Sequence, residues 1–319
     1  MNSTQTSASE ASEDFNAGSV AVCVILGLSF LIGAPGNLMV IWTILRHVKQ
    51  CLHNVVLILH LAFADLLAII TLPLWIYSIA TSWQLGHIAC KTLVYTVSCC
   101  MFSSIFLITL MSVGHFLAIC HPLVMMRLNT RIMSRCLTLL WILAVLLAAP
   151  ALLIDETDCF SWGYNSSTNM IVFSCLEIFF GFIVPLLILG FCYCRVAAQL
   201  RKINYNSKQK SMVLILCVTI TFTLCWLPHH IISIATLNCI LQEGTTYGCV
   251  PKSVVLSSGA LLLLSSSVNP VAYMFFGRNL QGSSEDSKLV RLFKEMATQT
   301  NRLVEQQQTA RGQQIPRLS

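Results

Sequence analysis

The chain has 319 residues, of which 56% are hydrophobic and only 10% are charged, and its mean hydropathy is +0.75. Charged residues make up about a quarter of an ordinary soluble domain, so the composition excludes that class and indicates a membrane protein. Basic residues exceed acidic ones, with a formal net charge of +6. Because these basic residues gather in particular loops, they indicate membrane topology and not nucleic-acid binding.

Seven apolar stretches are long enough to cross a membrane as helices, each of which needs about 20 residues. They lie near 18–46, 53–81, 88–120, 132–154, 169–200, 208–240 and 252–276. The sequence therefore predicts an all-α membrane protein whose seven-helix transmembrane domain covers 18–276. Residues 1–17 form an N-terminal segment and 277–319 a tail, so little is left for a second domain.

Basic residues fix the expected orientation, because cytoplasmic loops collect Lys and Arg. With residue 1 outside, the cytoplasmic loops contain ten basic residues and no acid, and the tail adds seven more. Only Lys91 and Lys252 of the 19 fall on the outer side. We expect a multi-pass plasma-membrane protein with an extracellular N-terminus and a cytoplasmic tail. Asn2 and Asn165 begin sequons on the outer side and are predicted glycosylation sites.

Four of the 15 cysteines lie at or beyond the outer ends of the spans, where oxidation is favoured. We expect Cys90 to pair with Cys159, and Cys239 to pair with Cys249 across the last outer loop. The other 11 cysteines are expected to be reduced, and those inside the spans to behave as small apolar residues rather than metal ligands.

Several of the spans contain a short, distinctive motif. They are Gly36-Asn37, Leu61-Ala62-Phe63-Ala64-Asp65, Trp141 with Pro150, Pro185 with Tyr193, Phe222-Thr223-Leu224-Cys225-Trp226-Leu227-Pro228 and Asn269-Pro270-Val271-Ala272-Tyr273. Proline removes a helix hydrogen bond and asparagine is costly in hydrocarbon, so the last motif marks a polar, bendable point in a protein interior. Together with seven spans, the motifs resemble those of the rhodopsin-like (class A) G-protein-coupled receptors over roughly 18–280. The resemblance implies heterotrimeric G proteins, and also arrestin, as partners.

Asp65 is one of only two acids within the predicted spans. A buried charge in a membrane is functional by default, and Ser104 and Asn269 can supply further oxygens. A hard cation such as sodium prefers oxygen ligands, and the cluster is similar to a sodium site in the family that empties on activation. The alternative is a protonated Asp65 that only hydrogen-bonds its neighbours. No other cofactor is expected.

The resemblance also assigns an activation core. Pro185, Ile105 and Phe222 match the packing switch of the family below the ligand, and Trp226 is expected at the pocket floor. Tyr193 and Tyr273 are similar to the pair that meets at the cytoplasmic end on activation. Rotation of the sixth span about Pro228 would repack this core and open its cytoplasmic end.

The third span departs from the family. The triplet Gly114-His115-Phe116 stands where Asp-Arg-Tyr is usual. In the family that arginine contacts the G protein, whereas an imidazole at His115 is mostly neutral at pH 7. Coupling is therefore expected to be either lost or loosened. If it is lost, the protein is a decoy or scavenger receptor that binds ligand without signalling.

The run Leu176–Pro185 and the Ser265–Pro270 phrase look most like leukotriene B4 receptors and related chemoattractant receptors. Glu177 lies inside the fifth span, where its carboxylate could accept hydrogen bonds from ligand hydroxyls, or else pair with a nearby histidine. The predicted ligand-binding residues are Tyr95, Glu177, Trp226, His229 and His230.

Other positions depart from those receptors, because Val94, Asp155 and His229 stand where they have His, Arg and Tyr. An acid at Asp155 would repel a ligand carboxylate. The expected ligand is a lipid mediator such as leukotriene B4, with a different lipid or a peptide amine as alternatives.

In the tail, Leu289, Leu292, Phe293 and Met296 follow the spacing of one helix face and are flanked by basic residues. This pattern predicts an amphipathic helix on the lipids of the cytoplasmic leaflet, or alternatively a frayed helix. Enzyme classes find no support, because the spans contain no nucleophile motif and no His-Glu-x-x-His. An opsin is excluded because Ser253–Gly277 lacks the lysine that retinal requires.

Overall fold

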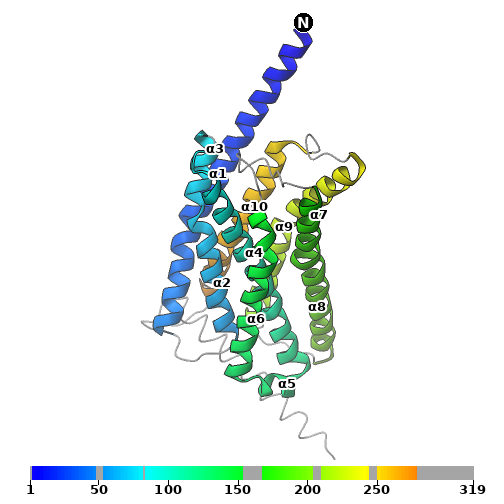
Figure 1. Ribbon diagram of the computed structural model, residues 1–319. Coiled ribbons are helices and arrows are strands. Elements are labelled where there is room, and N and C mark those ends of the chain that lie inside the picture. Colours follow the sequence, from blue (N-terminus) through cyan, green and yellow to red (C-terminus); the bar gives the residue numbers. More distant parts are fainter. Residues whose placement is uncertain are drawn as a thin grey trace, which may run out of the picture.

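A computed structural model describes residues 2–47, 53–81, 83–153, 167–203, 210–243 and 250–278. Within them, seven helical segments are long and apolar enough to cross a membrane. They are Gly18–His47, His53–Thr81, His87–Cys120, Thr130–Leu153, Ile171–Gln199, Leu216–Gln242 and Ser253–Met274. These segments pack side by side into one bundle (Figure 1). The predicted all-α, seven-span fold is confirmed.

The first helix, α1 (Asn2–His47), includes the N-terminal segment as well as the first span, and its N-terminal part projects from the bundle (Figure 1). It packs closely on the last helix, α10 (Lys252–Arg278), through two glycines. A Cβ atom on Gly33 would lie 2.6 Å from Ser267 Oγ, and one on Gly36 would lie 2.8 Å from Pro270 Cβ. These side chains leave no room for a larger residue, so glycine sets the distance between the helices.

The second span is bent at Thr71, between α2 (His53–Ile70) and α3 (Leu72–Thr81). The Thr71 backbone N–H and side-chain hydroxyl both donate to the Ala68 carbonyl, at 3.1 and 2.7 Å. Pro73 has no N–H to continue the helical ladder, so the helix restarts in a new direction. The bend directs Trp75 toward the interior cavity described below.

The third span, α4 (His87–Cys120), packs against α2, against α6 (Thr130–Ala148), and against the helices of the fifth and sixth spans. It begins after Gly86, whose φ of 82° suits glycine and whose carbonyl accepts a 2.9 Å hydrogen bond from Trp83 Nε1. The short α5 (Pro122–Arg127) follows at the far end of the bundle from the N-terminus (Figure 1). The Asn129 side chain caps α6 by accepting from the Ile132 N–H, and a 3₁₀ turn (Ala149–Leu153) ends the span.

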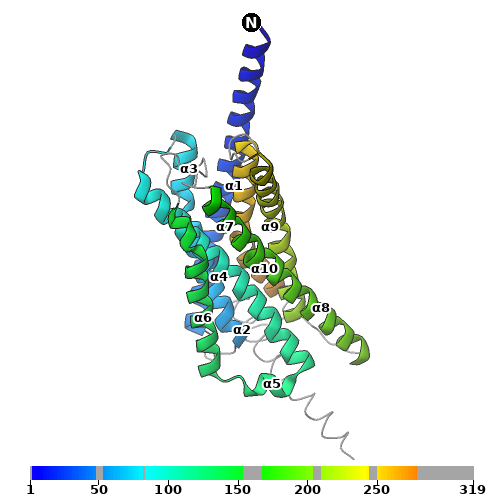
Figure 2. The same ribbon diagram turned by 45° about the vertical axis from the view of Figure 1, so that its right-hand side comes forward.

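The fifth span contains a wide turn. It consists of α7 (Ser167–Ile178), a π-helical turn η2 (Phe179–Ile183) and α8 (Val184–Ile203), which follow one another along one rod (Figure 2). The Val184 N–H donates to the Phe179 carbonyl, five residues back. Pro185 has no N–H for an ordinary bond to Gly181, which favours the wider turn at this place.

The sixth span is α9 (Lys210–Glu243), which contains Pro228 and packs against α10. Several predictions concern residues that the structure does not describe. These are the amphipathic tail helix over 289–296, the cysteines Cys159 and Cys249, the sequon at Asn165, and Asp155.

Candidate ligand pocket and activation core

A cavity of about 150 Å³ lies between α1, α3, α4, α7, α9 and α10, in the half of the bundle that is predicted to face outside. Most of its walls are apolar, with side chains such as Leu26, Trp75, Phe102, Phe173, Leu256 and Leu263. Among the described lining residues, ionisable side chains come only from Glu177 and His229, and none is a lysine or an arginine. An apolar cavity with few convergent polar groups is typical of a small-ligand site.

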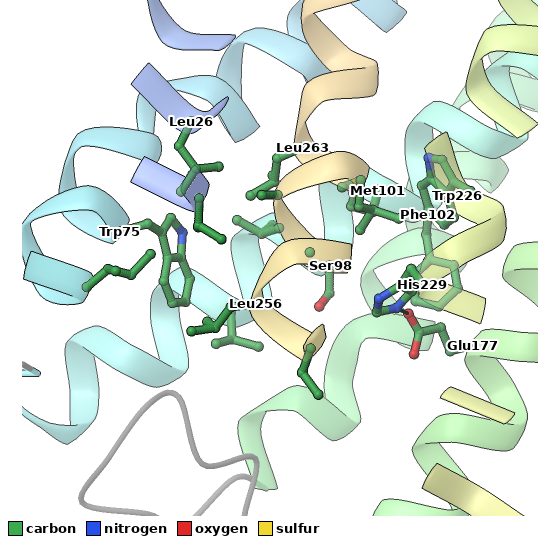
Figure 3. A pocket seen from close by; sticks show the side chains of 18 of the residues that line it. Leu26, Trp75, Ser98, Met101, Phe102, Glu177, Trp226, His229, Leu256 and Leu263 are labelled. Carbon is green, nitrogen blue, oxygen red and sulfur yellow. Dashed lines mark hydrogen bonds and ion pairs between the residues drawn. The ribbon is translucent and has the colours of Figure 1, made fainter. Parts of the chain in front are cut away.

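Glu177 of α7 and His229 of α9 form a hydrogen-bonded pair at this cavity, with 2.7 Å between His229 Nε2 and Glu177 Oε1 (Figure 3). Their side chains are only 16% and 11% exposed. Glu177 therefore has the histidine partner that the sequence suggested, and it also lines the cavity. The pair ties the fifth span to the sixth across the pocket wall.

Trp226 lines the cavity and belongs to a column of aromatic rings. Its ring stacks on Phe222 on one side, with centroids 4.6 Å apart, and lies 5.6 Å from His230 on the other. His230 in turn stacks on Phe182 of the π-helical turn, at 4.6 Å. The column thus runs along α9 from Phe222 to His230 and continues to Phe182 of the fifth span.

Two predicted ligand-binding residues do not line the cavity. The Tyr95 hydroxyl donates to the Val145 carbonyl of α6 at 3.4 Å, which directs the ring away from the pocket. His230 is fully buried behind Trp226, and neither of its ring nitrogens has a hydrogen-bond partner within the described residues. The structure thus brings Glu177, Trp226 and His229 together, and places Tyr95 and His230 outside the cavity wall.

The predicted polar cluster is assembled around Asp65, which is 1% exposed. Ser104 Oγ donates to Asp65 Oδ1 at 3.1 Å, and Asn269 Nδ2 donates to Oδ2 at 2.7 Å. Nearby, Asn37 Nδ2 donates to the Ser266 carbonyl at 3.1 Å. Three helices, α2, α4 and α10, therefore meet through the side chains that the sequence singled out.

The three residues of the predicted packing switch are all buried. Ile105 and Phe222 belong to one apolar core cluster that also contains Trp226. Pro185 is buried on the fifth span, directly after the wide turn. The apolar cluster also contains residues that line the cavity, such as Leu26 and Met101, so the cavity wall, Ile105 and Phe222 belong to one continuous core.

His115 points into the bundle. It is 8% exposed, and its Nε2 lies 3.4 Å from Asn54 Nδ2 of α2, so the ring nitrogen acts as the acceptor. A Cβ atom on Gly114 would meet Asn54 Oδ1 at 3.6 Å, an ordinary contact. The residue that stands in the arginine position therefore links α4 to α2 inside the protein. An imidazole held in this way presents no cation at the cytoplasmic surface.

Tyr193 joins three helices near the same end. Its hydroxyl lies 2.8 Å from Thr219 Oγ1 of α9 and 3.3 Å from Ser112 Oγ of α4. Tyr273 of α10 is 2% exposed in the core cluster. The two tyrosines are thus held by different neighbours in this conformation.

The described cysteines are of two kinds, disulfide-bonded and free. Cys90 and Cys239 are each disulfide-bonded, and the two cysteines predicted as their partners lie outside the described residues. Ten further described cysteines are free. Among the described residues, no group of histidine, cysteine and acidic side chains has the arrangement of a metal site.

The model of the rhodopsin family of 7 transmembrane receptors matches residues 36–273, which include every motif listed above. The chain belongs to the rhodopsin family of seven-transmembrane receptors. It is therefore a G-protein-coupled receptor and not an enzyme, and a multi-pass protein of the plasma membrane.

Several curated receptors of this family are similar along most of their length. Human (Homo sapiens) leukotriene B4 receptor 1 is 30% identical over 280 residues, which are 83% of this chain and 79% of that receptor. C-X-C chemokine receptor type 2 of Mus musculus is 30% identical over 283 residues, or 85% and 79% of the two chains. Chemerin-like receptor 2 of Mus musculus is 30% identical over 270 residues, or 81% and 76%.

Sequence reasoning missed most of the pocket wall. Trp75, Phe102 and Phe173 line the cavity, but an apolar residue in an apolar helix looks the same whether it faces lipid, core or ligand. The only usable signal was the bend at Thr71 and Pro73, which is visible in the sequence and turns Trp75 inward. Polar residues were found more readily because they are rare within the spans.

Proposed function

We propose that this receptor responds to an extracellular chemoattractant-type ligand, a lipid mediator such as leukotriene B4, and signals through heterotrimeric G proteins. The observation that carries the proposal is the Glu177–His229 pair in an apolar cavity that Trp226 also lines. A ligand at the pair contacts Trp226, whose displacement moves Phe222 in the core below. Similarity to leukotriene, chemokine and chemerin receptors supports a chemoattractant-type ligand, and among them the leukotriene B4 receptor supports a lipid.

We also propose that Asp65 and Ser104 bind a sodium ion in the resting receptor. Their oxygens converge on the interior, and such oxygens are the ligands that hard cations prefer. Asn269 presents its amide nitrogen to Asp65 in this structure, and would have to turn its amide to offer an oxygen. The test compares agonist affinity in sodium and in an organic cation, for the wild type and Asp65→Asn. Equal affinity in both media for the wild type would remove the proposal.

A second candidate function is ligand binding and internalisation without G-protein signalling. The burial of His115 against Asn54 favours it, because the position that carries an arginine in the family offers no cation to a partner. Arrestin would be the partner of such a receptor.

One experiment separates the two functions. G-protein dissociation is measured in cells with equal surface levels of the wild type and His115→Arg, dosed with leukotriene B4 and related hydroxylated fatty acids. A response of the wild type supports the signalling receptor. A response of His115→Arg alone supports the silent one, provided that His121→Arg, which adds the same charge at a nearby exposed position, gives none. Silence of all three would reject these lipids as agonists.

A further inference from the structure

The cavity has a polar end and an apolar end. Figure 3 shows Glu177 and His229 together on the α7 and α9 side, with Trp75 and Leu26 on the opposite side, from α3 and α1. Leu256 of α10 lines the wall between them. A ligand that fills this cavity therefore places its polar group at one end and hydrocarbon along the remainder.

The polar end carries no surplus positive charge. With one proton between them, Glu177 and His229 are neutral as a pair, and without that proton the pair is negative. The described lining supplies no lysine or arginine to compensate a further anion. A ligand carboxylate would lose its hydration here without gaining a cation, which is unfavourable in a buried site.

The same end has unused hydrogen-bonding capacity for an uncharged group. Glu177 uses only Oε1 in its bond to His229, which leaves Oε2 as an acceptor. A ligand hydroxyl can donate a hydrogen bond to this oxygen, whereas a group with no hydrogen to donate cannot.

We infer that the cavity binds an uncharged hydroxylated amphiphile, with its hydroxyl at the Glu177–His229 pair and its hydrocarbon running toward Trp75. A carboxylate elsewhere on the ligand adds no affinity in this site. The inference rests on the proposed function for the general ligand class, and it refines that class from lipid acids to neutral lipid alcohols.

Three lipids with the same 20-carbon chain test the inference by displacement binding to the full-length receptor in lipid nanodiscs. They are leukotriene B4, its methyl ester, which keeps the hydroxyls without the charge, and methyl arachidonate, which has neither. We expect the methyl ester to bind at least as tightly as the acid, and methyl arachidonate to bind about tenfold more weakly than the hydroxylated ester because the free Glu177 oxygen then has no donor. A clear preference for the acid over its ester, equal binding of the hydroxyl-free ester, or no binding of any of the three would overturn the inference.

Two variants locate the ends of the ligand. Glu177→Gln removes the charged acceptor and should weaken the hydroxylated ester about tenfold, while leaving methyl arachidonate unchanged. Gly259 of α10 lines the cavity, and a Cβ atom there would meet nothing within 4 Å, so the larger side chain of Gly259→Leu should reduce the space for the ligand. It should weaken both esters. The matched control is Gly190→Leu, at an exposed glycine of α8 with equally open space.

Binding is measured without a G protein, so the two proposals can fail separately. Binding of the ester without G-protein activation in cells would sustain the inference and reject signalling. Activation by the acid together with poor binding of the ester would sustain signalling and reject the inference. Equal loss of both esters in Gly259→Leu and in Gly190→Leu would also count against the assigned site.

Discussion

The Glu177–His229 pair predicts a specific pattern of stability. His229→Leu leaves a carboxylate without a partner in a site where both side chains are mostly buried, with 2.7 Å between the bonded atoms. Because the side chains are 16% and 11% exposed, we expect a cost at the lower end of the range for breaking a buried pair, about 3 kcal/mol. Glu177→Leu leaves an imidazole that can be neutral at pH 7, and should cost only about 1–2 kcal/mol.

The double variant of Glu177→Leu with His229→Leu removes both polar groups and leaves neither unpaired. Replacement of a buried pair by apolar residues is often neutral, so the double variant should lie within about 1 kcal/mol of the wild type. The coupling energy, which is the sum of the two single costs minus the cost of the double variant, is then about 3–6 kcal/mol. Thermal unfolding in identical nanodiscs gives the order of the four proteins. A double variant as unstable as the sum of the single ones would refute the reasoning, whereas Glu177→Leu with the distant Thr138→Val should be additive.

Two further predictions concern the frame of the bundle. Gly33→Ala should lower the stability of the receptor by about 1–3 kcal/mol, because the added Cβ would lie 2.6 Å from Ser267 Oγ. Gly27→Ala is the control and should leave stability unchanged, because an added Cβ there would meet no atom within 4 Å. The thermal unfolding midpoints of the two variants and the wild type test this difference. Cys90→Ser should lower stability by about 2–5 kcal/mol because its disulfide is lost. Cys136→Ser replaces an exposed free thiol and should leave stability unchanged. Surface expression and thermal unfolding midpoints measure both variants, and equal effects of the two substitutions would contradict the prediction.

The spans could be predicted from the sequence because each helix that crosses a membrane needs a continuous run of about 20 mostly apolar residues. The ends of the sixth span were less exact, since the helix runs on to Glu243, beyond the predicted 240. Hydropathy also gave no sign that α1 begins at Asn2, because polar residues in a helix that projects from the bundle contribute nothing to an apolar pattern.

The polar contacts were partly predictable, because each buried polar group in a membrane bundle must find a partner. The grouping of Asp65 with Ser104 and Asn269 follows from this rule, and the structure shows it. The contact of His115 with Asn54 could not be predicted from the sequence. Comparison with the family motif identifies the residue that differs, but it does not give the direction of that side chain.

The wide turn at Phe179–Ile183 has a consequence for the alignment and engineering of this receptor. Each residue of an α-helix advances the direction of its side chain by about 100°, so one residue more or fewer in this turn would rotate all of α7 relative to α8. Deletion of a single residue there would carry Glu177 away from His229 without changing the composition of either helix. Chimaeras that take α7 from another receptor must therefore match the phase of this turn as well as its residues.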